Sequence, residues 1–439
     1  MDTRLVSYSQ RAPGVEPADF LRQAQGHERF CWEHNTTVYA GFGIAVEITA
    51  WGEERFETIR ARAADLFRDV ALLNEEASAP RPRLFGGFSF RPDFVTENTW
   101  AAFAPAYFVL PHYQLTRTGG ETWLTINVQV GESDDLNEAD VRGALEAMID
   151  VLVSGRYRLP LPNELREINY PMPFEAWAEI IEDATGRMQA GELQKVVLAR
   201  VCELHFQERV DVDSALDFLR QKYTGCTIFL FEPSPYLAFY GATPELLVSV
   251  EGREIETMAL AGSIRRGATQ AEDDALAREL HDDPKNRDEH ALVADAVRER
   301  LAPLTETLNM PNEPQILRLS NIQHLYTPIR GTLKEETGVL PLVEVLHPTP
   351  AMAGVPADRA MDYISAAEPV PRGWYASPVG WIDDQLDGAF AVAIRSAISQ
   401  RERVWLYAGA GIVADSTPQK EWDETALKFK PMLDALGAE

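Results

Sequence analysis

The stretch Tyr407-Ala-Gly-Ala-Gly-Ile-Val-Ala-Asp-Ser-Thr-Pro-Gln-Lys-Glu-Trp-Asp-Glu-Thr-Ala-Leu-Lys428 decides how the end of this chain folds. It has the pattern of a strand end, a glycine-rich turn and the start of a helix. Ser416 or Thr417 can cap that helix, and Pro418 suits its first turn. Apolar residues recur beyond the turn at helical spacing and predict a buried stripe of Trp422, Ala426, Phe429, Leu433 and Leu436.

Three charged residues of this helix, Glu421, Glu424 and Lys428, are spaced three and four positions apart and so share one face. Two carboxylates beside a glycine turn are suitable ligands for Mg²⁺. The same spacing also fits a solvated charged face with a Glu–Lys pair, and spacing by itself leaves both interpretations open.

The charge of the chain limits the partners that it can have. Of 439 residues, 68 are acidic and 41 are basic, which gives a formal net charge of −27. Such a surface repels phosphate backbones and anionic lipid, so we expect neither nucleic-acid nor membrane binding. An anionic substrate would need a local cluster of cations or a metal ion.

The cysteines and the N-terminus indicate a cytoplasmic protein. Cys31, Cys202 and Cys226 are widely spaced and odd in number, which favours buried free thiols over disulfides or a zinc site. The N-terminus lacks a signal-peptide hydrophobic region, and no apolar run is long enough to cross a bilayer.

The order of predicted elements favours an α+β fold with large mixed, mostly antiparallel sheets packed with helices. A helical lead-in is expected up to about residue 30, followed by a region rich in strands to about residue 130 with a helix at 53–73. Further helices are expected within 174–190, 212–222, 270–280 and 284–301, and strands at 195–206, 226–231, 237–240, 246–250, 389–396 and 403–407.

A proline-rich connector, Leu159-Pro-Leu-Pro-Asn163, divides the chain into a β-rich part, residues 1–160, and a second part, residues 161–439. We expect the two parts to form one compact unit. The glycines at 409 and 411 lie too near the chain end to begin a dinucleotide-binding unit.

Two residues are candidates for proton transfer. Lys195 opens a strand and shares its apolar face, where poor solvation lowers the pKa of an amine toward that of a useful base. Glu245 precedes the run Leu246-Leu-Val, and an apolar setting raises the pKa of a carboxyl group until it can serve as an acid. Each residue also fits a purely structural position at a strand boundary.

Three further positions are candidates for binding. Glu289 lies on a capped helix and could add an oxygen ligand to Mg²⁺, although a surface helix explains it equally. Arg395, inside the apolar run Val392-Ala-Ile-Arg395, needs an anionic partner, which could be a bound carboxylate or an internal acid. His347-Pro-Thr-Pro350 is a rigid turn that carries a histidine and a hydroxyl.

Taken in order, these motifs resemble those of the chorismate-utilising enzymes, strongly over residues 165–435 and more weakly before them. The motifs that carry the resemblance are Gln194-Lys-Val-Val-Leu-Ala-Arg200, Gly241-Ala-Thr-Pro-Glu245, Leu260-Ala-Gly-Ser-Ile-Arg-Arg-Gly267, Lys285-Asn-Arg-Asp-Glu-His290, Gln323-His-Leu325, His347-Pro-Thr-Pro-Ala351, Arg372-Gly-Trp-Tyr375, Val392-Ala-Ile-Arg395 and the stretch 407–428. The resemblance implies a fold like that of anthranilate synthase component I, with residues 161–439 as the chorismate-binding core.

Within that family the likeness is greatest to isochorismate synthase, an isomerase that exchanges the C4 hydroxyl of chorismate for one at C2. The resemblance implies that Lys195 activates water and that Glu245 protonates the departing hydroxyl. It implies Mg²⁺ held by Glu289, Glu424 and, directly or through water, Glu421. It also implies a substrate-binding set made of Gly262, Ser263, His347, Thr349, Tyr375, Arg395, Gly411 and Lys428.

Comparison with sibling enzymes narrows the activity. Aminodeoxychorismate synthases carry a nucleophilic lysine where this chain has Ala259-Leu-Ala-Gly-Ser263, and anthranilate synthases lack the water-activating lysine that Lys195 resembles. Salicylate synthase shares the equivalents of Lys195 and Glu245 and is the main alternative. A non-catalytic chorismate-binding homologue is a further one. The sequence leaves open a monomer or weak homodimer, and a role in menaquinone, siderophore or salicylate biosynthesis.

Overall fold

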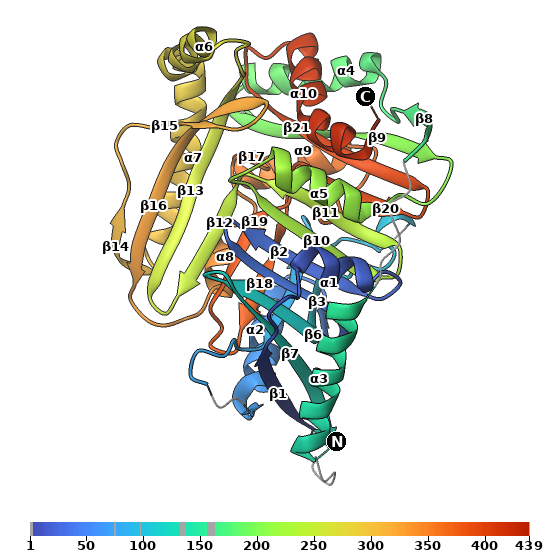
Figure 1. The fold of residues 1–439 in the computed structure, drawn as a ribbon. Coiled ribbons are helices and arrows are strands. Elements are labelled where there is room, and N and C mark those ends of the chain that lie inside the picture. The colour runs from blue at the N-terminus through green and yellow to red at the C-terminus, as the bar shows by residue number, and fades with distance from the viewer. Residues whose placement is uncertain (1–2, 74–75, 97, 132–136, 156–162, 439) are drawn as a thin grey trace.

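The computed structural model of this chain describes residues 3–73, 76–96, 98–131, 137–155 and 163–438. Its helices and large antiparallel sheet confirm the predicted α+β class (Figure 1). The helices are α1 (Pro17–Gln23), α2 (Arg55–Arg68), α3 (Glu138–Ser154), α4 (Phe174–Gln189), α5 (Val212–Lys222), α6 (Gln270–Asp282), α7 (Pro284–Leu301), α8 (Leu340–Leu346), α9 (Ala357–Ala367) and α10 (Pro418–Leu436), with a 3₁₀ turn at Asn98–Trp100. The strands are β1 (Thr3–Arg11), β2 (Arg29–His34), β3 (Thr37–Ala50), β4 (Ala71–Leu72), β5 (Arg83–Phe88), β6 (Ala106–Thr118), β7 (Glu121–Gly131), β8 (Leu165–Asn169), β9 (Lys195–Phe206), β10 (Thr227–Ser234), β11 (Leu237–Thr243), β12 (Leu246–Glu251), β13 (Glu254–Arg265), β14 (Thr305–Asn309), β15 (Gln315–Arg318), β16 (Ile322–Leu333), β17 (Gly354–Val355), β18 (Pro378–Asp383), β19 (Gly388–Val392), β20 (Ser396–Gln400) and β21 (Arg403–Ile412).

The described strands join into one hydrogen-bonded sheet system in which β6 pairs with β3 along one edge and, along the other edge, first with β5 and then with β7, where the sheet branches. One arm runs from β6 through β3, β2, β10, β11, β20 and β21 to β9. The other arm runs from β6 through β5, β18, β19, β12 and β13 to β16. Helix α7 packs on β13, and α10 lies beside β21, so helices from both arms enclose the space where the arms meet (Figure 1).

The chain passes between the two arms at β11–β12 and again at β19–β20. Hydrogen bonds tie the two crossings together: the Val392 amide donates to the Glu245 carbonyl at 3.0 Å, and Thr243 Oγ1 donates to the Val392 carbonyl at 2.6 Å. The single strand predicted over 389–396 is therefore wrong, because β19 ends at Val392 and Arg395 has a φ of 53°. That left-handed backbone turns the chain from one arm into the other.

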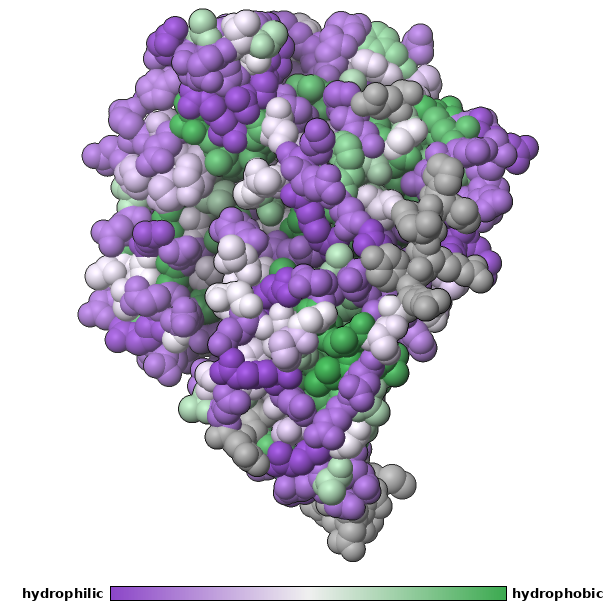
Figure 2. All heavy atoms as spheres, viewed as in Figure 1, coloured by the Kyte–Doolittle hydropathy of each residue, from purple (hydrophilic) through white to green (hydrophobic). Residues whose placement is uncertain are grey.

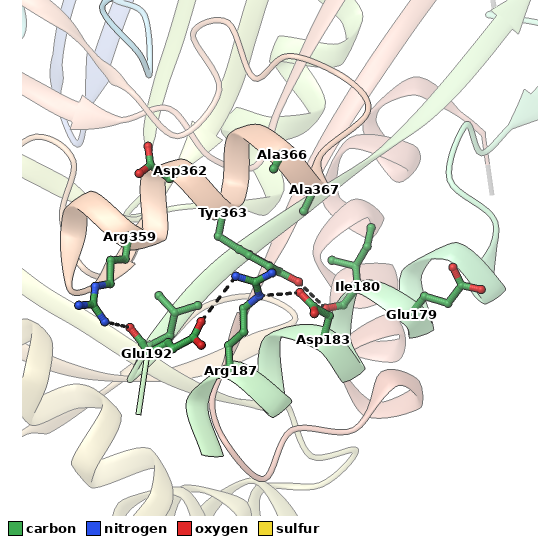
Figure 3. Close-up of a pocket in the computed structure, with 11 residues that line it drawn as sticks. Glu179, Ile180, Asp183, Arg187, Glu192, Arg359, Asp362, Tyr363, Ala366 and Ala367 are labelled. Carbon is green, nitrogen blue, oxygen red and sulfur yellow. Dashed lines mark hydrogen bonds and ion pairs between the residues drawn. The ribbon is translucent and has the colours of Figure 1, made fainter. Parts of the chain in front are cut away.

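The start of β9 is fixed by contacts between α4 and α9 (Figure 3). Tyr363 of α9 donates its hydroxyl to the Ile180 carbonyl of α4 at 2.9 Å, and the guanidinium of Arg187 lies 5.2 Å from the Tyr363 ring centre. Arg359 donates to the Glu192 carbonyl at 3.0 Å, just before the strand begins. Strand β17 then pairs with the first residues of β9. Several elements thus hold the first residue of β9 in place.

The N-terminal region differs from the prediction of a helical lead-in, which is wrong. Residues 3–11 form β1, which pairs antiparallel with β7, and only the short α1 is helical before β2. Ser7 and Ser9 occupy the buried face of β1 and bind Asn127 at 2.9 Å and Thr125 at 2.7 Å. Since these buried residues are polar, the alternation typical of a strand is hidden.

The predicted start of α10 is confirmed, because Thr417 is its N-cap residue and Pro418 its first residue, although the Thr417 side chain makes no capping hydrogen bond. The connector predicted at 159–163 falls almost entirely on residues 156–162, which lie outside the described residues, so the division near residue 160 stays a prediction. Within the described chain, no helix is long and apolar enough to cross a membrane. The face seen in Figure 2 is mostly hydrophilic, as the net charge of −27 suggests.

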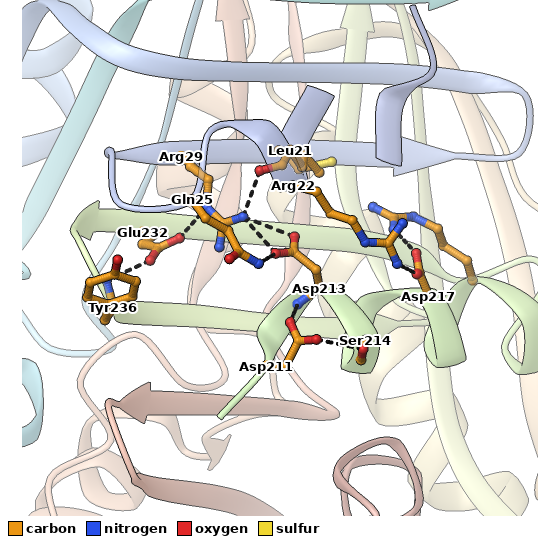
Figure 4. Close-up of polar contacts among 12 residues, drawn as sticks. Leu21, Arg22, Gln25, Arg29, Asp211, Asp213, Ser214, Asp217, Glu232 and Tyr236 are labelled. Atoms are coloured by element: carbon orange, nitrogen blue, oxygen red, sulfur yellow. Dashed lines mark hydrogen bonds and ion pairs between the residues drawn. The ribbon is translucent and has the colours of Figure 1, made fainter. Parts of the chain in front are cut away.

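A buried network of charges joins the N-terminal strands to α5 and β10 (Figure 4). The Arg29 guanidinium donates to Glu232 at 2.6 Å, to Asp213 at 3.0 Å and to the Leu21 carbonyl at 2.8 Å. All three charged side chains are buried. A buried cation that is fully hydrogen-bonded is tolerated, whereas a buried charge without its partner is costly.

We therefore expect Arg29→Met to lower the free energy of unfolding by about 3–5 kcal/mol, because Asp213 and Glu232 would remain buried without a cation. Arg60→Met is the control: Arg60 pairs with Glu57 on the solvent-exposed side of α2, and its loss is expected to cost less than about 1 kcal/mol. Urea denaturation of both variants measures the difference. Equal midpoints would mean that the network does not stabilise the fold.

Candidate active site

A cavity of about 220 Å³ lies where the two arms of the sheet meet. It is lined by β13, β16, β21, α7, α10 and the two crossings between the arms. Ten of the residues predicted for the site line it: Glu245, Gly262, Ser263, Glu289, Tyr375, Arg395, Gly411, Glu421, Glu424 and Lys428.

Lys195, the first residue of β9, lies beside this cavity with only 1% of its surface exposed. Its Nζ donates to Glu289 Oε1 at 2.9 Å. Burial, the largest single influence, would raise the pKa of Glu289, but Lys195 together with Lys428 and Lys285 lowers the net pKa. The lysine and the carboxylate are thus a tightly held ion pair in this structure.

Gly411 on β21 leaves room for that ion pair. A methyl group at this position would lie 2.9 Å from Glu289 Oε1 and 3.2 Å from Lys195 Cε. The register places Gly411 opposite Val197 of β9, two residues from Lys195. A larger residue at this position would therefore press on the flexible ends of the Lys195 and Glu289 side chains and would displace the ion pair.

Glu245 lies at the crossing between β11 and β12 and is 4% exposed. Burial raises its pKa to about 7, although the charges of Lys195, Arg395 and Lys428 act to lower it. A carboxyl group with this pKa can hold its proton near neutral pH and can also release it. The charge of Lys195 acts on the Glu245 carboxyl group, so the two candidate proton-transfer groups interact electrostatically in the folded chain.

Arg395, at the second crossing, presents a cation to the same cavity. It is 8% exposed, and its guanidinium makes no hydrogen bond or ion pair with the residues that the structure describes. Burial lowers its pKa, although nearby Tyr375 and Glu424 oppose this change. A buried guanidinium with unused donors is suited to a bound carboxylate.

Glu289 of α7 and Glu421 and Glu424 of α10 supply carboxylates to the cavity. Burial and the charge of Glu424 raise the pKa of Glu421 to about 7, and Glu424 itself binds Lys428 at 2.6 Å. Oxygen ligands of this kind fit Mg²⁺, which needs only one or two carboxylates and retains water. Within the described residues, however, no three acidic, histidine or cysteine side chains converge closely enough to hold a metal ion.

Besides Lys195, which lies beside the cavity, two residues of the predicted set, His347 and Thr349, are not part of its lining. The His347 ring packs near Phe56 and Phe90, with its Nε2 3.2 Å from the Phe90 carbonyl, and burial lowers its pKa to about 3. Thr349 is buried, and its carbonyl accepts from the Met352 and Ala353 amides. The turn orients Ala351 and Met352, which line the cavity, whereas the side chains of His347 and Thr349 do not line it, and their role as substrate contacts stays a prediction.

The structure adds His324, which the individual residue analysis missed. Its Nδ1 lies 3.3 Å from the Gly262 carbonyl, whereas its Nε2 is buried and has no hydrogen-bond partner. Burial lowers its pKa to about 3, so the ring is neutral and offers an acceptor to the cavity. The sequence signal for this residue was the motif Gln323-His-Leu325, which served only to identify the family resemblance.

Cationic residues around the cavity were also missed: Lys285, Arg372 and Lys420 line it. Arg372 is buried and donates to the Val197 carbonyl at 2.7 Å and the Met352 carbonyl at 2.8 Å. These contacts tie β9 to the turn that follows Thr349. Together with Lys195, Arg395 and Lys428, these cations offset the negative charge of the whole chain at this one place.

Comparison with known proteins gives the family. Residues 1–437 match the family described as "Chorismate binding enzyme". This chain belongs to that family, which confirms the resemblance found in its motifs.

Individual relatives are similar over nearly the whole chain. "Isochorismate synthase MenF" of Bacillus subtilis is 34% identical over 99% of this chain and 94% of its own length. "Salicylate biosynthesis isochorismate synthase" of Pseudomonas aeruginosa is 35% identical over 93% of this chain and 84% of its own length.

Two solved structures share the fold. The menaquinone-specific isochorismate synthase MenF of Escherichia coli aligns with a TM-score of 0.81 and 27% identity over 99% of this chain and 95% of its own. Anthranilate synthase component I of Streptococcus pneumoniae aligns with a TM-score of 0.69 and 20% identity over 93% of this chain and 91% of its own, which confirms the predicted fold.

The raised pKa of Glu245 predicts a dependence of stability on pH. Because its pKa is about 7 in the folded chain and about 4.5 when exposed, the folded state holds an extra proton between these values. The contribution of Glu245 to the free energy of unfolding is therefore complete below pH 4.5 and is lost as the pH rises to 7. Glutamine does not titrate, so the variant escapes this loss. We expect the difference in free energy of unfolding between Glu245→Gln and the parent to change in favour of the variant by on the order of 3 kcal/mol from pH 5 to pH 8.

Thermal or urea unfolding at several pH values measures this gain. Glu251→Gln, at the exposed end of β12, is the control and should follow the parent at every pH. A parallel pH profile for the Glu245 variant and the parent would contradict the raised pKa.

Proposed function

We propose that this chain is an isochorismate synthase, an isomerase that interconverts chorismate and isochorismate. The observation that carries the proposal is that Glu245 lines one cavity of a chorismate-binding fold, while buried Lys195, whose charge acts on Glu245, lies beside it. Four further cavity groups suit a dicarboxylate substrate that binds together with a divalent cation. Arg395 suits a substrate carboxylate, and Glu289, Glu421 and Glu424 suit the cation.

In the proposed reaction, water adds to C2 while the hydroxyl at C4 leaves and the double bonds of the ring shift. Lys195 would take a proton from the attacking water, for which it must first leave its ion pair with Glu289 and lose a proton. Glu245, as the neutral acid that its pKa of about 7 allows, gives a proton to the departing hydroxyl. Lys195 gains the proton that the attacking water loses, and Glu245 gives a proton to the departing hydroxyl. The number of protons is therefore balanced.

The remaining residues would orient the substrate. Arg395 and Tyr375 would bind the enolpyruvyl carboxylate, and Lys428 would add positive charge near the ring carboxylate. His324 Nε2 could accept a hydrogen bond from a ring hydroxyl, since it has no other partner within the described residues. Gly262 and Ser263 on β13 complete the proposed substrate contacts.

We propose Mg²⁺ as the cofactor, with Glu289, Glu424 and, directly or through water, Glu421 as its ligands once these carboxylates leave the ion pairs that now keep them apart. When bound, a divalent cation would neutralise the ring carboxylate of the substrate. In this structure Lys195 binds Glu289 and Lys428 binds Glu424, so the cations of the chain now compensate the carboxylates. We further propose a cytoplasmic monomer or weak homodimer, with residues 1–160 and 161–439 as the two parts of one catalytic unit.

Incubation with chorismate and Mg²⁺, followed by chromatographic identification of the products, tests this proposal. We expect a mixture of chorismate and isochorismate, because the reaction exchanges one allylic hydroxyl for another with little net driving force. Removal of Mg²⁺ by a chelator should stop turnover, and added Mg²⁺ should restore it. Salicylate with pyruvate would instead indicate salicylate synthase, and an amine formed only with ammonia would indicate an aminating relative.

The role of Lys195 has a separate test. We expect Lys195→Ala to lower kcat by about 10²–10⁴-fold, which is typical for loss of a general base. The variant should still bind chorismate in the presence of Mg²⁺, as calorimetry can measure, because Arg395 and the three cavity glutamates remain. Lys222→Ala, at the exposed end of α5, is the control. Unchanged turnover in the Lys195 variant would refute the assignment and favour a different base.

A further inference from the structure

One edge of β9 is only partly covered by other strands. Along its first edge β9 pairs with β21 from Val196 to His205. Along the second edge β17 pairs with the first two residues of β9, and β8 pairs with the last four. Between them, from Val197 to Cys202, no described strand pairs with this edge. The backbone groups of this gap need other partners, because a buried amide or carbonyl without a hydrogen bond is costly.

A buried ion pair supplies two of these partners. Glu368, at the end of α9, accepts the Ala199 amide with its Oε1 at 2.8 Å. Arg372 donates from Nη2 to the Val197 carbonyl at 2.7 Å. An amide and the carbonyl two residues before it are the groups that one residue of a parallel neighbouring strand would bind. The ion pair thus takes the place of a strand along the gap.

Each nitrogen of the Arg372 guanidinium already binds a protein acceptor. Its Nε donates to Glu368 Oε2 at 2.9 Å, its Nη1 to the Met352 carbonyl at 2.8 Å, and its Nη2 to the Val197 carbonyl. Arg372 lines the proposed active site, but this bonding suits a residue that holds the backbone in place. Arg395, whose side chain has no partner in the described chain, is by contrast available for a substrate carboxylate.

The ion pair is almost completely buried. Only 3% of the Arg372 side chain and 6% of the Glu368 side chain are exposed. The attraction between two buried charges is offset by the cost of removing them from water, so such a pair adds little stability relative to apolar side chains of similar size. Its geometry is strict, because the planar guanidinium fixes the direction of each hydrogen bond. A role in positioning therefore explains this pair better than a role in stability.

The segment that carries the pair is connected to the rest of the site. The two members of the pair are joined by Pro369-Val-Pro371, in which each proline fixes its own φ. The Tyr375 amide donates to the Arg372 carbonyl at 2.9 Å, and the Ala376 amide donates to the Ala393 carbonyl at 3.0 Å. One short segment therefore connects β9, Tyr375 and the second crossing between the arms of the sheet.

We propose that Glu368 and Arg372 are positioning residues for Lys195: by completing the open edge of β9, they set where the proposed proton acceptor lies. Lys195 precedes Val197 by two residues and shares its face of the strand, so a shift of the strand at Val197 moves the amine with it. A displacement of about 1 Å between reacting groups can cost on the order of 10²-fold in rate. The role of Lys195 rests on the proposed function, whereas the hold on β9 does not.

Two conservative variants test the proposal. Arg372→Lys keeps the charge, but its single nitrogen cannot span the positions of the three guanidinium nitrogens. We expect kcat with chorismate to fall by about 10–100-fold and KM to stay within about threefold of the parent, because the side chain is not a substrate contact. Glu368→Gln keeps an acceptor for the Ala199 amide and should lower kcat by less than about tenfold. Arg60→Lys, in the exposed pair on α2, is the control and should match the parent.

Hydrogen-exchange mass spectrometry gives a second measurement, which needs no turnover. We expect peptides that cover Val197–Cys202 to exchange about tenfold faster in Arg372→Lys than in the parent, because a strand edge opens more readily when a hydrogen-bond partner is lost. Arg60→Lys should exchange like the parent. Circular dichroism confirms that each variant is folded, and Glu368→Gln decides the comparison if Arg372→Lys fails to fold.

Three results would overturn the proposal. Unchanged exchange of β9 in the folded variants would mean that the pair does not hold the strand. A KM raised by more than about tenfold at unchanged kcat would make Arg372 a substrate contact instead. Faster exchange with unchanged kcat and KM would mean that this edge does not set the position of Lys195. A parent protein that does not turn over chorismate would contradict the proposed function, while the exchange comparison would still support or overturn the hold on β9.

Discussion

The structure depends on the two places where the chain crosses between the arms of the sheet. At each crossing the backbone leaves one set of strands and enters the other, and the Val392 amide and carbonyl bind the opposite crossing. Glu245 lies at one crossing and Arg395 at the other, so two hydrogen bonds to the Val392 backbone, one from the Thr243 hydroxyl and one to the Glu245 carbonyl, hold the two crossings together. A side chain on an irregular segment is usually mobile, but these segments are buried between strands and cannot move independently.

Burial at that junction explains the chemistry of the cavity. Low solvent access raises the pKa of Glu245 and Glu421 and lowers that of His324, so it favours the neutral form of each group. Charges that remain buried are paired, as with Lys195 and Glu289, or await an anion, as with Arg395. The cavity thus combines groups that can exchange protons with groups that can bind charge. A chain with a large negative charge can then attract an anionic molecule at one place only if cations are concentrated there.

The sequence predicted the elements that have strong periodicity or clear end signals. Helix α10 begins at Thr417 and Pro418 as expected, and β9 begins at Lys195, because capping residues and apolar runs are local signals. The strand β1 was missed since its buried serines pair with polar residues more than a hundred positions away. The break at Arg395 was missed because a left-handed arginine has no local signature. His347 and His324 were misjudged for a similar reason: which histidine faces the cavity depends on how distant strands meet.

The branching of the sheet at β6 has a consequence for synthesis of the chain. Strand β5 finds one of its neighbours, β18, only after about 290 further residues have been added, which takes about 15–60 s at ordinary rates of translation. During that interval one edge of β5 offers unpaired backbone groups, and such edges recruit other chains. Folding of the first third must therefore remain reversible, or be shielded by a chaperone, until the ribosome has released nearly the whole polypeptide.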